Sequence, residues 1–136
     1  MDPTIELNAK LDRPRSVARA VQFLFSAVVI GLLNAIYTLV QRVAGLPMLI
    51  ALVIVIAFFG LFFFLVMKIS AGRNWARIIW LILVICNVPF AVLAYPQAVR
   101  ANVISGTLSI IIVLLQVIGT ILLFTGNSNA WFRRRK

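Results

Sequence analysis

The chain has 136 residues, of which 63% are hydrophobic and only 12% are charged, and its mean hydropathy is +1.10. A soluble domain is about 45–50% apolar and roughly 25% charged, and a globule of 15.1 kDa leaves too much surface in water to bury such a surplus. The composition therefore excludes soluble enzymes, secreted disulfide scaffolds and disordered proteins. It predicts a small protein that crosses a membrane several times.

The net charge of +10 and the pI near 11.7 are values typical of proteins that bind nucleic acid. The thirteen Lys and Arg residues, however, form short clusters separated by long uncharged stretches, so they provide no continuous stripe along a duplex. We therefore expect no nucleic-acid partner. The single cysteine, Cys86, lies within an apolar stretch, which excludes an intrachain disulfide and a thiolate metal site.

The basic residues divide the chain into four long apolar segments. Uncharged stretches of 22, 25, 22 and 32 residues separate successive basic positions, and a membrane-spanning helix needs about 20 mostly apolar residues. The alternation typical of β-barrel strands is missing. We predict an all-α membrane protein, a bundle of four transmembrane helices within residues 21–124, flanked by basic tails at 1–20 and 125–136. The helices are expected at about 21–40, 47–67, 78–95 and 103–124.

The distribution of basic residues predicts the orientation of this bundle. Eleven of the thirteen fall in the two tails and in the loop after the second helix, whereas Arg42 and Arg100 alone mark the opposite side. Cytoplasmic loops carry the excess of Lys and Arg, so we expect both termini in the cytoplasm. Trp75, Trp80 and Trp131 are then expected in the aromatic belt of the cytoplasmic interface.

Two segments hint at an internal duplication. Arg15–Arg19 and Arg73–Arg77 both read R-x-x-A-R, and each precedes the first helix of a predicted hairpin. One interpretation is a pair of parallel-related hairpins, an arrangement that some transporters use. The other interpretation is that every cytoplasmic interface recruits Arg and Trp, which produces such similarities without duplication.

The predicted spans contain no ionisable side chain suited to catalysis. The acidic residues Asp2, Glu6 and Asp12 all lie in the first twelve positions, and the chain has no histidine. General acid–base catalysis, metal binding and proton relays all depend on titratable groups of these kinds. We therefore expect no enzymatic activity, no metal and no cofactor.

A small set of amide and hydroxyl side chains is what remains polar inside the spans. The second helix has no strongly polar residue, so the first, third and fourth helices are expected to meet. Such groups either join helices through hydrogen bonds or line a path for a small polar solute, and both interpretations stay open. The candidate interhelical contacts are Asn34, Asn87, Ser109, Gln116 and Thr120.

Basic residues beside a span attract anionic lipid headgroups, at about 1 kcal/mol for each side chain. We therefore expect a lipid bilayer with anionic headgroups on the cytoplasmic side as one partner of the chain. The candidate lipid contacts are Arg73, Arg77, Arg133, Arg134, Arg135 and Lys136.

The loop Lys68–Arg77 reads K-I-S-A-G-R-N-W-A-R, and Asn129–Phe132 reads N-A-W-F before the final basic run. With its four predicted spans, the chain resembles small, mostly uncharacterised bacterial four-helix inner-membrane proteins. The resemblance implies a bacterial cytoplasmic membrane, and it carries no catalytic or binding residue to transfer.

Two function hypotheses follow. The first is a non-enzymatic membrane protein that acts through helix–helix contacts with a membrane-protein partner, either as an accessory subunit or as an immunity-type protector against a membrane-targeting toxin. The alternative is a small transporter or channel subunit that works as a homo-oligomer on a small polar solute. A phage-type pore former is a third, weaker option.

Overall fold

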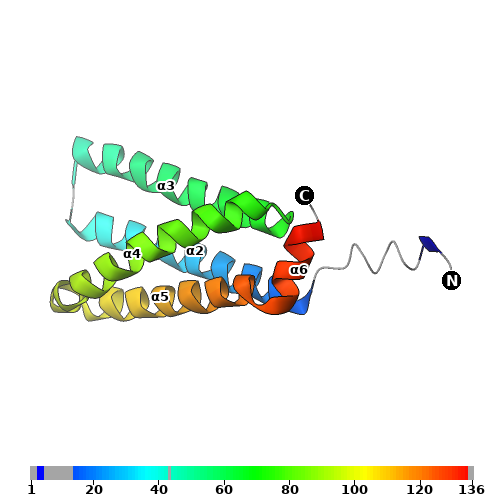
Figure 1. Ribbon diagram of the computed structural model, residues 1–136. Coiled ribbons are helices and arrows are strands. Elements are labelled where there is room, and N and C mark those ends of the chain that lie inside the picture. The colour runs from blue at the N-terminus through cyan, green and yellow to red at the C-terminus, as the bar shows by residue number, and fades with distance from the viewer. Residues whose placement is uncertain (1–2, 5–13, 43, 135–136) are drawn as a thin grey trace.

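The computed structural model describes residues 3–4, 14–42 and 44–134, and the ordered elements of this part are all helices. The four long helices, α2 to α5, are apolar enough to cross a membrane. The prediction of an all-α chain with four long apolar helices is therefore confirmed, while their orientation and insertion stay predictions. The helices, shown in Figure 1, are α2 (Arg15–Arg42), α3 (Leu46–Ser70), α4 (Asn74–Ala101), α5 (Val103–Phe124) and α6 (Gly126–Arg134).

Helices α2 and α4 are longer than the sequence predicts. Each has 28 residues, which is about 42 Å of helix, whereas the hydrocarbon core of a bilayer is about 30 Å thick. α2 begins at Arg15 and α4 extends from Asn74 to Ala101, because intrahelical hydrogen bonding continues beyond the edge of an apolar stretch. Both helices are thus long enough for their ends to reach the headgroup regions.

The connections between the long helices are short. Gly45 precedes α3 with a φ of 74° and is followed by a proline in the first turn, while Gly72 adopts a φ of 81° between α3 and α4. Only glycine enters this left-handed region without strain. Asn102 separates α4 from α5, and its Oδ1 accepts hydrogen bonds from the amides of Ile104 and Ser105 at 3.0 and 3.2 Å. This cap satisfies two amides of the first turn of α5.

The hydrophobic core lies at one end of the bundle, which we call the closed end. It comprises the start of α2, the α3–α4 turn, the end of α5 and α6 (Figure 1). The buried residues of α3 all fall in its C-terminal part, and those of α4 fall in its first three turns. The largest fully buried side chains are Val17, Leu24, Leu65, Ile69, Trp80, Leu123, Ser128 and Phe132.

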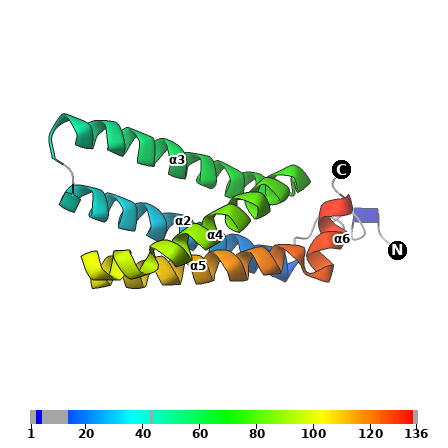
Figure 2. The ribbon, with the colours of Figure 1, turned by 60° about the vertical axis from the view of Figure 1, so that its left-hand side comes forward.

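The opposite end of the bundle, which we call the open end, contains the end of α2, the start of α3 and the α4–α5 junction. Figure 2 shows α3 diverging from α2 and α4 toward this end. Helices α2 and α5, by contrast, pack closely against each other. A Cβ atom on Gly119 of α5 would lie 2.5 Å from Leu24 Cδ2 of α2. Small residues of this kind let transmembrane helices approach closely.

The contacts among the spans agree in part with the polar pattern of the sequence. α5 packs against both α2 and α4, which joins the three helices that carry polar residues. α3, which has no strongly polar side chain in residues 47–67, packs against α2 and, to a smaller extent, against α4. α3 is therefore part of the bundle and packs mainly at the closed end.

Residues 125–136, expected as a basic tail, include the short helix α6, which packs on the closed end. Ser128 Oγ donates to the Leu122 carbonyl at 2.8 Å and lies 2.9 Å from Ser16 Oγ of α2. Trp131 and Phe132 are buried beside it. α6 thus packs against the bundle through its own apolar and hydroxyl side chains.

The expected tryptophan belt needs correction. Trp75 is exposed, but Trp80 is fully buried and its indole N–H donates to Thr120 Oγ1 at 3.1 Å. Trp131 is 6% exposed and packs edge-on against Phe132. Trp80 and Trp131 therefore lie in the interior of the closed end, and the indole N–H of Trp80 has the hydrogen-bond partner that a buried indole usually finds.

Candidate functional site

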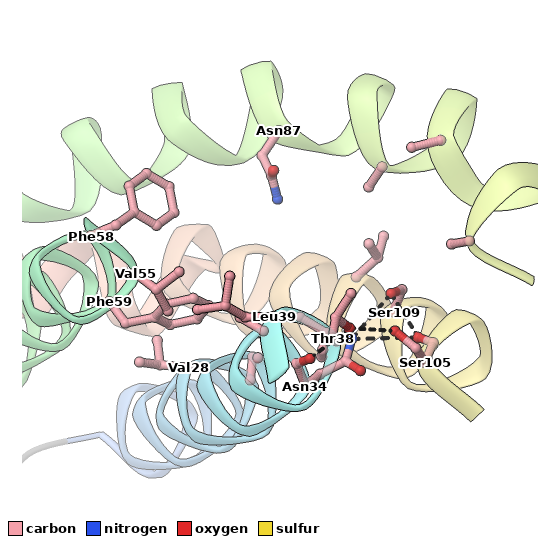
Figure 3. Close-up of a pocket in the computed structure, with 18 of the residues that line it drawn as sticks. Val28, Asn34, Thr38, Leu39, Val55, Phe58, Phe59, Asn87, Ser105 and Ser109 are labelled. Carbon is pink, nitrogen blue, oxygen red and sulfur yellow. Dashed lines mark hydrogen bonds between the residues drawn. The ribbon is translucent and has the colours of Figure 1, made fainter. Parts of the chain in front are cut away.

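A cleft of about 860 Å³ lies between α3 and α4, and residues of α2 and α5 form its floor (Figure 3). The first α3 residue that lines it is Val55, since the earlier part of α3 lies away from the other helices. The cleft therefore widens toward the open end. Its volume is within the 300–1,000 Å³ range of small-molecule binding sites.

The floor of the cleft carries a hydrogen-bonded seam between α2 and α5 (Figure 3). Thr38 Oγ1 donates to the Asn34 carbonyl at 2.8 Å, so the proton in its 3.0 Å contact with Ser105 Oγ comes from Ser105. Ser109 Oγ donates to the Ser105 carbonyl at 2.9 Å. Asn34 Nδ2 lies 3.4 Å from both the Ser105 carbonyl and Ser109 Oγ. These bonds join α2 to α5 along the floor of the cleft.

A second polar contact, between α4 and α5, lies farther from the open end of the cleft. Asn87 of α4 is exposed and projects into the cleft (Figure 3). Its Nδ2 donates to Gln116 Oε1 of α5 at 3.4 Å. Gln116 is only 7% exposed. One turn later on α5, Thr120 Oγ1 donates to the Gln116 carbonyl at 2.6 Å and accepts from Trp80. The pair therefore connects the cleft to the core of the closed end.

The structure thus divides the predicted polar set into two groups. Asn34 and Ser109 belong to the α2–α5 seam, and Asn87 and Gln116 form a separate α4–α5 pair. Thr120 belongs to the second group through its bond to the Gln116 carbonyl. No hydrogen bond joins Asn34 to Asn87 or Gln116 among the described residues, and Asn34 Oδ1 is buried there without a partner.

Aromatic side chains of α3 form the wall of the cleft that faces these polar groups. Phe58 and Phe59 lie edge to face with ring centroids 5.9 Å apart, and both project toward the cleft with Val55 (Figure 3). Phe59 also contacts α2, because a Cβ on Gly31 would lie 2.9 Å from Phe59 Cε1. The opposite wall, on α4, is lined by small residues, among them Ala91, Ala94, Ala98 and Ala101.

At the open end the cleft adjoins a polar hollow of about 160 Å³. Cleft and hollow share Thr38, Arg42 and Ala101. Arg42 is the charged residue among those that line the two spaces. In the hollow, Asn102 Nδ2 donates to Tyr37 Oη at 3.1 Å, which leaves the Tyr37 hydroxyl proton available to a further acceptor.

Arg77, one of the predicted lipid contacts, turns into the protein instead. Its Nη1 donates to Asn129 Oδ1 at 2.8 Å and to the Leu123 carbonyl at 3.4 Å. The guanidinium lies 4.9 Å from the ring centre of Phe124 and 4.6 Å from that of Phe132. Hydrogen bonds and two cation–π contacts thus replace the lipid phosphate as partners of this charge.

The other predicted lipid contacts have different positions. Arg73 and Arg133 are exposed at the closed end, and their contact with headgroups stays a prediction. The backbone of α6 ends at Arg134. Arg135 and Lys136 lie outside the described residues, as do the three acidic residues of the N-terminal segment.

The chemistry available in the cleft is hydrogen bonding, apolar contact and one cation. Within the described part of the chain no group of three His, Cys, Asp or Glu residues gathers to hold a metal. No protein-family model, no curated protein and no solved structure matches the chain. The cleft must therefore be interpreted from its own residues.

Sequence reasoning missed several residues of this site. Thr38 is one helical turn after Asn34, so helical spacing alone indicates that they share a face. No such pattern marks Phe58 and Phe59, because residues 47–67 of α3 are apolar on every side. Arg42 was assigned only to the orientation of the chain, and its position at the mouth of the cleft depends on how α2, α3 and α4 pack.

Proposed function

We propose that this chain is a non-enzymatic integral membrane protein that acts through helix–helix contacts with another membrane protein. Its role is that of an accessory subunit or an immunity-type protector. The proposal rests on the open surroundings of Gly60, which lies on the exposed face of α3. The space around it is open, since a Cβ built there meets no atom within 4 Å.

Gly60 differs in this respect from the glycines that pack inside the bundle. Cβ atoms on Gly31, Gly106 and Gly119 would lie 2.9, 2.5 and 2.5 Å from side chains of neighbouring helices. Glycine inside a helix costs about 1 kcal/mol relative to alanine, and no internal contact offsets this at Gly60. Small residues are typical of surfaces where transmembrane helices touch. Ala57, also exposed and one turn earlier, extends the surface.

A leucine at position 60 tests the proposal, because it fills the open space without disturbing the bundle. A photo-crosslinking amino acid at the exposed neighbour Val53 is introduced into the full chain in its native membrane. We expect a discrete crosslinked partner in the wild type and its loss in Gly60→Leu. Cys86→Leu, a small-to-large change at an exposed position of α4, serves as the matched control and keeps the crosslink. A crosslink unaffected by Gly60→Leu would contradict the proposal.

We further propose a bacterial cytoplasmic membrane as the location, with both termini in the cytoplasm. The excess of basic residues in the tails and the α3–α4 turn supports this orientation. Four long apolar helices are consistent with it.

A second candidate function is a small oligomeric transporter or channel subunit for a small polar solute. The amides of Asn34, Asn87 and Gln116 along the cleft favour it. In proteoliposomes this function predicts solute flux that Asn87→Leu reduces. Vesicles that stay impermeable to ions and small polar solutes would remove this candidate.

A further inference from the structure

The cleft and the adjoining hollow share three lining residues, and together they differ in polarity from one end to the other. The hollow is lined by Tyr37, Gln41, Arg42 and Asn102 at the open end, and the deep part of the cleft is lined by the phenylalanines of α3. Arg42 and Asn102 lie at helix ends, where a membrane helix meets the headgroup level. A polar end at the headgroup level and an apolar end at depth match an amphiphile.

We propose that this space binds a single-chain phospholipid, with its phosphate at Arg42 and its alkyl chain between Phe58, Phe59 and the alanines of α4. The site goes beyond the helix-contact function, because the surface around Gly60 lies on the exposed side of α3 and is not part of the cleft.

The charge of Arg42 favours an anionic headgroup. Arg42 forms no ion pair or hydrogen bond within the described part of the chain, and that part contains no Asp or Glu. Tyr37 offers its hydroxyl proton and Gln41 its amide protons in the same hollow. A phosphate has several oxygens that accept such donors together, and guanidinium–phosphate bonds are among the stronger hydrogen bonds in proteins.

The deep part of the cleft favours an alkyl chain. Asn34 Nδ2 bonds to the serines and Asn87 Nδ2 to Gln116, while Asn34 Oδ1 is buried without a partner. The two amide donors therefore place little demand on a polar ligand. The phenylalanine rings and alanine methyl groups provide van der Waals contact for an alkyl chain along the remaining length.

The length of the cleft also suits an alkyl chain. The lining of α2 extends from Ala27 to Arg42, which corresponds to about 22 Å along the helix axis. An alkyl chain that begins near Arg42 can lie along this length, and it is much narrower than a helix.

Native mass spectrometry of the full chain in a neutral detergent tests the proposal. The probes are three amphiphiles with the same alkyl chain, namely lysophosphatidylglycerol, a monoacylglycerol and a fatty acid. We expect one lysophosphatidylglycerol to bind in preference to both. Preference for the monoacylglycerol would overturn the role of Arg42, and equal or tighter binding of the fatty acid would overturn the phosphate assignment.

Arg42→Gln and Arg100→Gln form a matched pair, because both arginines lie near the open end and only Arg42 lines the cleft or the hollow. We expect Arg42→Gln to weaken lysophosphatidylglycerol binding about tenfold or more and Arg100→Gln to leave it nearly unchanged. Ala94→Trp, which fills the cleft and keeps Arg42, is expected to abolish binding, with unchanged helix content by circular dichroism as its folding control.

Two results would overturn the site while leaving the helix-contact function intact. One is equal weakening by the two arginine variants, which would indicate charge attraction anywhere on the surface. The other is full binding by Ala94→Trp. Loss of the crosslink at Val53 in Gly60→Leu concerns the proposed partner alone, so failure of either proposal is distinguishable from failure of the other.

Discussion

Arg77 Nη1 and Asn129 Oδ1 lie 2.8 Å apart, and their hydrogen bond joins the first turn of α4 to α6. The two residues are 52 positions apart in the chain. The guanidinium also contacts the rings of Phe124 at the end of α5 and Phe132 on α6. One side chain of α4 therefore holds the end of α5 and the short C-terminal helix together.

Replacement of Arg77 is the first test of this arrangement. We expect Arg77→Leu to lower the free energy of unfolding in detergent by about 1.5–3 kcal/mol, because a charge-assisted hydrogen bond and the cation–π contacts are lost and Asn129 loses its donor. Limited proteolysis should cut near α6 sooner. Arg73→Leu, at an exposed position of the same turn, is the control and should change stability little. Equal effects of the two variants would contradict the internal role of Arg77.

The Asn87–Gln116 pair predicts a modest stabilising effect. We expect Asn87→Leu to weaken the bundle by no more than about 1–2 kcal/mol, since hydrogen bonds between membrane helices are weak in net terms. Insertion should not suffer, because leucine raises the hydrophobicity of α4. A double-mutant cycle with Gln116→Leu in chemical unfolding measures the coupling, for which we expect about 0.6 kcal/mol. Zero coupling would show that the 3.4 Å contact is not a stabilising bond.

Substitution by alanine is expected to have opposite effects on stability at Gly119 and at Gly60. Gly119→Ala brings a methyl group to 2.5 Å from Leu24 Cδ2, so we expect a loss of about 1–3 kcal/mol through overpacking of α2 against α5. Gly60→Ala meets no atom within 4 Å and should stabilise the isolated chain by up to about 1 kcal/mol through helix propensity. Thermal unfolding of the two variants in one detergent compares them. A destabilised Gly60→Ala would mean that α3 packs differently.

The orientation of the chain is tested by reporter fusions. We expect cytoplasmic signals from the N-terminus, from residues 68–77 and from the C-terminus, and external signals from residues 42–46 and 96–102. Reversal of Arg42 and Arg100 to glutamate should leave this pattern unchanged, because the rule counts Lys and Arg and the basic excess stays on the same side. A C-terminus on the external side would contradict the four-span arrangement.

Composition and the spacing of charges were sufficient to predict four helices, because a bilayer demands long apolar segments whose backbone bonds are satisfied internally. The range 103–124 predicted for the last span has the same bounds as α5. The ends of α2 and α4 were not predictable in this way, since a helix continues through polar residues such as Arg15 and Arg100 as long as nothing caps it.

The assignment of Arg77 and Trp80 required the tertiary structure. In sequence both lie where a span meets the interface, and hydropathy treats every such Arg and Trp alike. Only the position of α6 decides that Arg77 faces Asn129, and only the contact of α4 with α5 decides that Trp80 finds Thr120. A side chain at an interface faces lipid or protein according to the rotation of its helix, which neighbouring helices determine.

The cleft, too, could be found only from the tertiary structure. The sequence alone indicated which residues are polar, and helical spacing placed Asn34 and Ser109 on the faces of their own helices. It did not determine that α3 diverges at the open end, because an apolar helix has no preferred face and lipid solvates each side equally well. That divergence separates Val55 from α4, leaves Asn87 at the edge of an open space, and places Arg42 at its mouth.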